Sequence, residues 1–441
     1  MPAANIAAQA GEAQINLFEI GSNYNDPVDV SGGIIELNYY ESVLDNTIRA
    51  TATFADTGYR KGEGSAVFEE SDLNLTVGEN VNLKVTDGNQ FLLDFTGPKE
   101  LRIKEIRNIA ESTNKVIFTV DLFSKESINN ELEQHRVRQR FDGKISDSIE
   151  KILTEILNTE KEVDIDETLN NLSFIGNVEK PFYKLTWLAA RSVPDIQNAK
   201  GNLAGYFFYE TYEGFKFKSI DKLFIDQKPK RILIFTNIIE ETIPDGYDGK
   251  ILDYSFDSTM DLKSILLTGS QTAAKMKGVN SYESSYRENP FESSKQFNED
   301  NTGGKKQPKI ASDLGIQEQV SRISYKWDDP GFVVQGKNLS EQLPKSTYIN
   351  YSNDEILRQS SMRYNNLFNI KLSIAIAGDM SLRAGDLIFC DFPEITSNQT
   401  KSYSKKKSGI YMIIDACHRV TKNGCFTRLN LVRESIGRKS F

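Results

Sequence analysis

The chain has 441 residues, which is more than a single hydrophobic core usually supports, so several domains are expected. Hydrophobic residues make up 39% of it and aromatic residues 10%, which is ample for packed cores and argues against global disorder. The formal net charge of −9 argues against tight DNA binding, because that needs a basic face. The charge does not exclude passage of nucleic acid through an acidic pore.

Targeting signals and long apolar segments are not expected in this chain. Met1–Gly11 is small and polar and lacks the basic and apolar regions of a secretory signal. No apolar run approaches the roughly 20 residues of a membrane helix, so stable membrane association is not expected. Cys390, Cys417 and Cys425 all fall in strand-like runs, which favours buried thiols in a reducing compartment. We therefore expect synthesis in a cytoplasm.

The first part of the chain, residues 12–124, predicts a β module. Runs of β-branched and aromatic residues are bounded by Gly, Asn and Asp, as is typical of short strands. The expected strands are Gly33–Tyr40, Ile48–Phe54, Leu73–Val85 and Phe91–Phe95, followed by a long hairpin of Leu101–Ile109 and Lys115–Phe123.

Residues 125–226 predict an inserted α+β domain. Apolar residues between Ile145 and Leu157 recur with the spacing of an amphipathic helix. A second helix is expected to begin at Pro181, a good first-turn residue, and to run to Arg191. Tyr206–Thr211 and Phe215–Ile220 then predict a hairpin across Glu213-Gly214.

Residues 227–268 and 354–436 predict a second β module that is split by a polar excursion over residues 269–353. Leu252–Thr268 is expected to supply its opening strands, and Asp354–Asn365 a short helix behind the cap Asn353. The strands that follow are Leu367–Ile376, Leu387–Phe392, and a hairpin of Ile410–Val420 and Cys425–Val432 across Asn423-Gly424.

The two β modules carry matching sequence features. Gly78-Glu79 precedes one strand and Gly385-Asp386 precedes another; similarly, Phe118-Thr119 and Phe426-Thr427 open runs that close at Lys125–Ser127 and Arg433–Ser435. Both matches have nearly the same separation along the chain, which makes coincidence less credible. We therefore predict a duplicated module, each copy a small barrel whose closure removes exposed strand edges. An open sheet with edges that pair with neighbours is the alternative.

Residues suited to catalysis are scarce, and we predict no catalytic, cofactor-binding or metal-binding residues and no cofactor. His135 lies in a charged run that is typical of a solvated segment. His418 adjoins Cys417, but neighbouring strand residues point to opposite faces, so this pair is not expected to act together. Because carboxylates are abundant in this acidic chain, the sequence does not exclude a catalytic carboxylate pair of the glycosidase type.

Three further patterns fall short of known sites. Gly303-Gly304-Lys305-Lys306 lacks the spacing of a phosphate-binding loop, and Asp164-Ile165-Asp166 lacks the glycine and closing glutamate of a calcium loop. Lys405-Lys406-Lys407 is interpreted as a solubilising loop, with contact to an acidic partner as the alternative. The partner-binding residues are unknown at this stage.

With these residues in hand, the chain resembles the central hub proteins of contractile-tailed phage baseplates. The resemblance is carried by Lys180-Pro181-Phe182 through Trp187-Leu188-Ala189, by Gly205–Thr211 with Glu213-Gly214-Phe215, and by a C-terminal set. That set comprises Ala377-Gly378-Asp379, Leu382–Asp386, Ser408–Tyr411, His418 and Thr427–Arg433. Residues 270–312 and 317–345 have no counterpart that aligns.

The resemblance implies a mainly β fold with two related small barrels separated by an α+β domain. It also implies a non-enzymatic homotrimer, whose six barrels form a pseudo-sixfold ring between a sixfold tail tube and a threefold cell-puncturing spike. Its implied partners are the spike, the tail tube or its initiator proteins and other baseplate proteins, with DNA passing only transiently. The implied location is the virion tail.

Two alternatives stay open. One is the hub of a phage-derived contractile injection system, and the other is a carbohydrate-acting tail enzyme. Because nothing resembling a needle or a second spike domain follows Arg433, we expect a separate spike protein in either hub.

Overall fold

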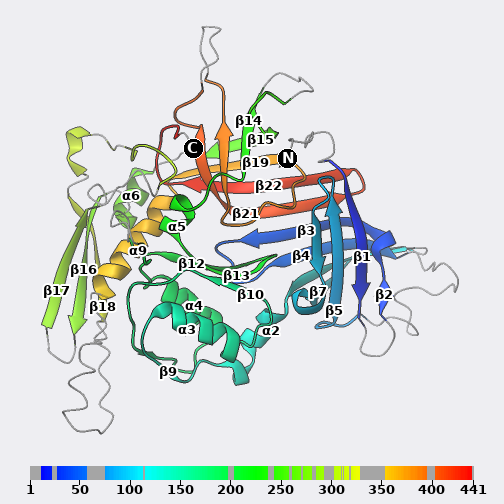
Figure 1. The fold of residues 1–441 in the computed structure, drawn as a ribbon, viewed down its shortest axis with the longest axis horizontal. Helices are drawn as coiled ribbons and strands as arrows, with labels where there is room; N and C mark the ends of the chain where they lie inside the picture. Colours follow the sequence, from blue (N-terminus) through cyan, green and yellow to red (C-terminus); the bar gives the residue numbers. More distant parts are fainter. Residues whose placement is uncertain are drawn as a thin grey trace.

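The structure is a computed structural model of an elongated, mainly β molecule (Figure 1). It describes residues 11–21, 27–56, 75–112, 115–196, 203–236, 243–257, 261–269, 272–280, 285–292, 302–308, 310, 312–316, 319–327, 353–394 and 403–439. A 14-stranded sheet runs through both predicted modules, and three smaller sheets accompany it.

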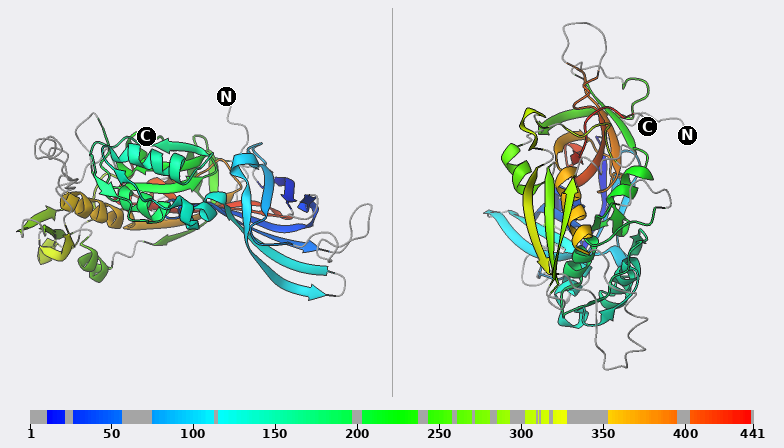
Figure 2. Two further views of the ribbon diagram at one scale, coloured as in Figure 1. Left: turned by 90° about the horizontal axis from the view of Figure 1, so that it is seen from below. Right: turned by 90° about the vertical axis from the view of Figure 1, so that its left-hand side faces the viewer.

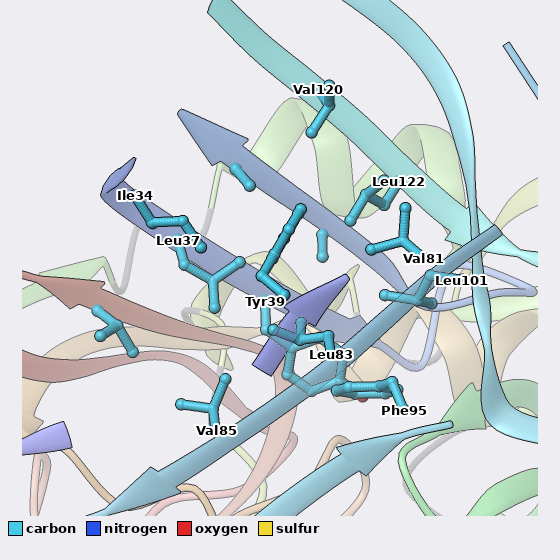
Figure 3. Close-up of a cluster of buried hydrophobic side chains, with 14 of the residues drawn as sticks. Ile34, Leu37, Tyr39, Val81, Leu83, Val85, Phe95, Leu101, Val120 and Leu122 are labelled. Atoms are coloured by element: carbon cyan, nitrogen blue, oxygen red, sulfur yellow. The ribbon is translucent and has the colours of Figure 1, made fainter. Parts of the chain in front are cut away.

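The first module is a strongly curved part of the large sheet. Its strands are β1 (Ala13–Ile20), β2 (Val28–Asp29), β3 (Ile34–Ser42), β4 (Arg49–Asp56), β5 (Asn80–Asp87), β6 (Leu92–Phe95), β7 (Leu101–Ser112) and β8 (Lys115–Ser124). Every second side chain of β5 is buried, as expected for a strand with one face on a core. These inward residues meet those of β3, β7 and β8 in a single apolar cluster (Figure 3).

The second module is a closed six-stranded barrel. Its strands are β14 (Arg231–Phe235), β15 (Gly249–Asp257), β19 (Ile370–Ala377), β20 (Leu387–Asp391), β21 (Gly409–Thr421) and β22 (Gly424–Arg433). Around the ring they follow the order β14-β15-β19-β22-β21-β20 and return to β14. The mainly β fold class with an α+β insertion is therefore confirmed.

The same strand order occurs in both modules. Beginning at β1, the first module runs β5-β7-β8-β4-β3, just as the second runs β20-β21-β22-β19-β15 from β14. The details agree as well: β7 has a bulge between Ile103 and Glu105, and β21 has one between Ile413 and Asp415. β3 and β15 share a bulge between their first two paired positions. The predicted duplication is thus present at the level of strand register.

Strand pairing closes only the second module among the described residues, so the predicted barrel closure is shown there and not in the first module. β14 runs parallel to both β15 and β20, and these pairings complete the second ring. β1 occupies the place of β14 but runs antiparallel to β5. It pairs with the short β2, and the Val30 N–H, just before β3, donates to the Phe18 carbonyl at 2.8 Å.

One of the two sequence matches is correct and the other is out by one residue. Gly78 and Gly385 both have positive φ, and their N–H groups donate to the equivalent carbonyls of Ile103 and Ile413 at 2.7 and 2.8 Å. The match of Phe118 with Phe426 is wrong, because Phe118 lies in the core whereas Phe426 is 45% exposed. Phe118 pairs with Asn108, and Thr427 pairs with His418. Asn108 and His418 are equivalent because they lie equally far along their strands from the matching bulge, so Thr427 is the counterpart of Phe118.

The α+β domain lies on one side of the large sheet (Figures 1 and 2). It contains the helices α2 (Lys125–Glu131), α3 (Ile145–Lys151), α4 (Pro181–Ala189) and α5 (Ile220–Ile225), and a π-helical turn at Ile152–Ile156. Its strands are β9 (Arg140–Phe141), β10 (Glu162–Ile165), β11 (Phe174–Ile175), β12 (Tyr206–Thr211) and β13 (Gly214–Ser219). The helix from Ile145 and the helix from Pro181 are both present, and both pack on a shared apolar core.

The region between β15 and β19 differs from the sequence expectation. Leu262–Thr268 forms helix α6 and not a strand, since Asp261 caps it by accepting from the N–H groups of Lys263 and Ser264. The residues expected to be a polar excursion include a three-stranded sheet of β16 (Ala273–Asn280), β17 (Ser285–Glu292) and β18 (Val320–Trp327). Helix α9 (Asn353–Leu367) lies beside this sheet (Figure 1).

In the part of the chain that the structure describes, no helix is both long enough and apolar enough to cross a membrane.

Candidate assembly site at the junction of the two modules

The two modules are joined by direct pairing of β3 with β21. The strands are antiparallel, from Glu36 opposite Thr421 to Ser42 opposite Asp415 (Figure 1). β21 is long enough to pair with two strands along one edge: its first residues pair with β20, and its later residues pair with β3. The second barrel thereby extends its sheet into the first module.

Polar contacts fix the ends of this junction. Arg419 forms an ion pair with Glu36 at 2.9 Å, and the Ser42 hydroxyl donates to an Asp415 carboxylate oxygen at 2.6 Å. Both pairs are at least partly exposed, so each contributes about 1 kcal/mol or less and serves mainly to set the register.

The inner face of the junction is buried and holds His418. Its ring stacks on Tyr39 with centroids 6.0 Å apart. Nε2 lies 3.2 Å from the Leu382 carbonyl, which can only accept, so Nε2 carries the proton of the neutral ring. Nδ1 therefore accepts from the Thr427 hydroxyl at 3.0 Å, and the oxygen of that hydroxyl accepts from the Asp379 N–H. Burial, and then the charge of Arg383, lower the pKa of His418 to about 3. His418 is accordingly a neutral packing residue.

Glu41 ties three parts of the molecule together from the buried end of β3. One carboxylate oxygen accepts from the Tyr39 hydroxyl at 2.8 Å and from the Tyr212 N–H at 2.9 Å, which links it to the α+β domain. The other accepts from the Ala384 N–H of the second module at 3.0 Å. Burial raises the pKa of Glu41, although the charge of Arg383 opposes that rise. Glu41 thus contributes to the placement of all three parts relative to one another.

A second buried cluster joins the first module to the α+β domain. Lys161 Nζ lies 2.6 Å from a Glu210 oxygen and 2.8 Å from a Glu126 oxygen, and all three side chains are at most 4% exposed. Burial alone would lower the pKa of Lys161, but the charges of Glu210 and Glu126 outweigh it and raise the pKa. Ser124 Oγ, at the end of β8, donates to a Glu210 oxygen at 3.0 Å and so anchors the cluster to the first module.

The residues that could have suggested chemistry lie apart or already have partners. Cys417 is on the outer face of β21, opposite to the side of His418, as the strand alternation predicts. His135 contacts Gln134 and the Ile156 carbonyl. The described cysteines form no disulfide, and burial raises the pKa of Cys390 and Cys425.

The remaining motifs have structural roles. Asp164 forms ion pairs with Lys216 and Lys218, which leaves it unsuited to calcium. Gly303 and Gly304 are buried against the end of the second barrel, and Lys305 N–H donates to the Ile436 carbonyl. In the described residues no group of His, Cys, Asp or Glu could hold a metal ion.

The lysine loop also packs on the second barrel. Lys407 Nζ lies over the rings of Tyr254 and Phe256, at 5.1 and 5.7 Å from their centroids. At least this lysine therefore contributes to the barrel itself and not only to solubility.

In the large sheet, β7 and β15 each have a stretch whose one edge is unpaired within the described structure. Beyond Ile103, β7 is hydrogen-bonded only to β8, because β5 reaches no further than Leu101 and Arg102. Beyond Ile251, β15 is paired only with β19, because β14 reaches no further than Ile251. Figure 2 shows the hairpin of β7 and β8 projecting from the body of the molecule.

Neither a protein-family model nor any curated protein sequence matches the chain. Two solved structures are similar over nearly the whole length of both chains. The 43 kDa tail protein of prophage MuSo2 from Shewanella oneidensis has a TM-score of 0.53 at 8% identity, covering 96% of this chain and 99% of that one. The tail protein from Neisseria meningitidis MC58 has a TM-score of 0.52 at 9% identity, covering 95% and 96%. The chain has a phage tail-protein fold.

In this tail-protein fold the most elaborate arrangement is the junction. The sequence singled out His418, Cys417 and Gly385 near it, but gave no sign that β3 pairs with β21. Glu41 and Lys161 were missed altogether, because an isolated charged residue in a sequence resembles any solvated one. The position of Glu41 at an inward place of an alternating strand is the one signal that could have identified it.

Proposed function

We propose that the chain is the structural hub of a contractile-tail baseplate, a homotrimer that joins the sixfold tail tube to the threefold spike. The observation that carries this proposal is the duplication of one six-stranded module within a single chain. A trimer of such chains presents six related modules, so the same ring meets a sixfold partner on one face and a threefold partner on the other.

The modules are suited to this role because they are alike in register and unlike in detail. The second module is closed by β14, whereas in the first module β1 takes the place of β14 and pairs with the short β2. The α+β domain and the sheet of β16–β18 occur once per chain, so they supply the threefold features of the ring.

The proposed partners are the chain itself, the spike, the tail tube or its initiator proteins and other baseplate proteins, in the tail of a virion assembled in the host cytoplasm. We propose that the ring is not an enzyme and that DNA passes through its bore without stable binding. The net charge of −9 on each chain supports weak DNA contact if it lines the bore.

The test is the mass of the purified protein, alone and with its spike, measured by light scattering on a sizing column. We expect a particle near three times 49.8 kDa at sufficient concentration. A chain that stays monomeric at every concentration, even with the spike present, contradicts the proposal. Electron microscopy of the assembled particle, locating this chain between tube and spike, tests the role directly.

The hub of a phage-derived injection system is the second candidate, because the same fold and symmetry would serve it. Genes for a capsid and a terminase beside this one would favour the phage, and toxin genes would favour the injection system. A carbohydrate-acting tail enzyme is the third candidate, tested by clearing of peptidoglycan or capsular polysaccharide in a gel.

A further inference from the structure

The unpaired stretches of β7 and β15 correspond, through the duplication, to the two strands that join the modules within the chain, β21 and β3. β7 is the counterpart of β21, since each accepts a hydrogen bond from the N–H of an equivalent turn glycine, Gly78 or Gly385, and each carries a bulge at the same place. β15 is the counterpart of β3, since both carry the same early bulge. Hence the unpaired part of β7 is equivalent to the part of β21 that pairs with β3. The unpaired part of β15 is equivalent to the part of β3 that pairs with β21.

Burial differs at equivalent positions in the way that a missing neighbour would cause. In the internal junction, Leu37 and Tyr39 of β3 are each 2% exposed. Their counterparts in β15, Tyr254 and Phe256, are only half-buried. These two aromatic residues therefore carry apolar surface that a further strand would cover.

The β7 side shows the same contrast. Ala416 of β21 is 1% exposed in the internal junction, whereas its counterpart Ile106 in β7 is only half-buried. The edges of β7 and β15 thus have the strand, the direction and the inward apolar residues of a junction, with no second strand among the described residues to complete it.

From this correspondence we propose that β7 of one chain pairs antiparallel with β15 of the next, repeating the β3·β21 junction between copies. This proposal rests on the proposed ring and specifies how its subunits join. Cys417 lies opposite Tyr40 in the internal junction, and their counterparts are Arg107 and Asp257. Arg107 of one chain therefore lies opposite Asp257 of its neighbour.

The charges of these residues suit the pairing. Both side chains are exposed, and opposite charges directly across an antiparallel pair are favourable. Arg107 also contacts Asp121 of its own chain at 2.7 Å, so it would lie between two carboxylates. Lys104 and Glu105, which are exposed beside it, put charge on this edge and thereby discourage unspecific strand pairing before assembly.

The test is a disulfide between copies at this register. In a Cys417→Ser background, the full-length chain carries Arg107→Cys and Asp257→Cys and is oxidised at trimer-forming concentration. Directly opposite residues have Cα atoms about 4.5–5.5 Å apart, which a disulfide can span. The matched control replaces Asp253 in place of Asp257: it is an exposed aspartate on the same face of β15, displaced by about 13 Å along the strand.

We expect covalent species of two and three chains from the 107–257 pair, and almost none from the 107–253 pair or from either single variant. If light scattering shows a trimer but the 107–257 pair forms no disulfide, or if the 107–253 pair forms it equally well, the proposed register is wrong and the proposed hub is unaffected. Absence of any oligomer overturns both. Hydrogen exchange of the unmodified protein provides a second measurement: amides of residues 104–107 and 252–257 should exchange more slowly in the trimer than in diluted monomer, and unchanged exchange there contradicts the pairing.

Discussion

His418 makes the stability of the second module depend on pH. Its pKa is lowered to about 3 in the folded protein, by burial first and by the charge of Arg383 second. In the unfolded chain the pKa returns to about 6.5. Because the folded pKa is lower, the unfolded state binds the proton more readily, so stability is fully present above pH 6.5 and is lost as pH falls toward 3.

The size of this loss follows from the two pKa values. One proton bound only by the unfolded state costs about 1.4 kcal/mol per pH unit, and the partly titrated range near pH 6 reduces the effect. Between pH 6 and pH 4 the His418 contribution to the free energy of unfolding should fall by about 2.5 kcal/mol.

The assay is urea unfolding at several pH values between 7 and 4, for the unmodified protein and for His418→Gln. The variant lacks the titrating ring, so its free energy of unfolding should fall by about 2.5 kcal/mol less over the range from pH 6 to pH 4. Thr427→Ala is the control, since it removes a partner of the ring but keeps the imidazole; it should lose stability at pH 7 and keep the steep pH dependence. Equal slopes for His418→Gln and the unmodified protein would refute the reasoning.

Two further comparisons use pairs of matched sites. Lys161→Met should cost about 3–5 kcal/mol, because it leaves buried carboxylates without their counter-ion, whereas Lys180→Met removes an exposed pair and should cost about 1 kcal/mol or less. Equal shifts of the urea midpoint would contradict this. Gly78→Ala should cost about 1–2 kcal/mol through its positive φ alone, and Gly385→Ala should cost more, because its new methyl group would also overlap the Tyr209 hydroxyl. Thermal unfolding that ranks the two glycine variants in the reverse order would refute the steric argument.

Local patterns predicted the elements of this fold better than their connections. Strand alternation and turn residues predicted β3, β4, β7, β8, β21 and β22 closely, because each has one buried face and a marked turn. The two copies of the turn at Gly78 and Gly385 were found because a positive φ there favours glycine in each module. The match at Phe426 failed because the spacing between equivalent strands differs by one residue, which moves a side chain to the other face.

The long-range pairings had no comparable signal. β14 lies inside the second ring and is bonded on both edges, yet its sequence shows no alternation that would place it beside β15. The pairing of β3 with β21 joins segments from the two ends of the chain, and backbone hydrogen bonds leave no mark on composition. Polarity was also misleading: residues 273–280 and 285–292 look like a solvated excursion but form strands of a small sheet.

The internal junction explains why duplication within one chain suits a ring. A single module with one unpaired β7-type edge and one unpaired β15-type edge would add copies head to tail, and whether such a series closes depends on the rotation at each junction. Here the first of every two junctions is made within the chain, where Glu41 and the stacked pair of Tyr39 and His418 fix its geometry. Under the proposed pairing only every second junction is formed by association, so three intermolecular junctions complete a ring of six modules. The intramolecular junction needs no partner to form, and under the proposed pairing the intermolecular junction repeats its register.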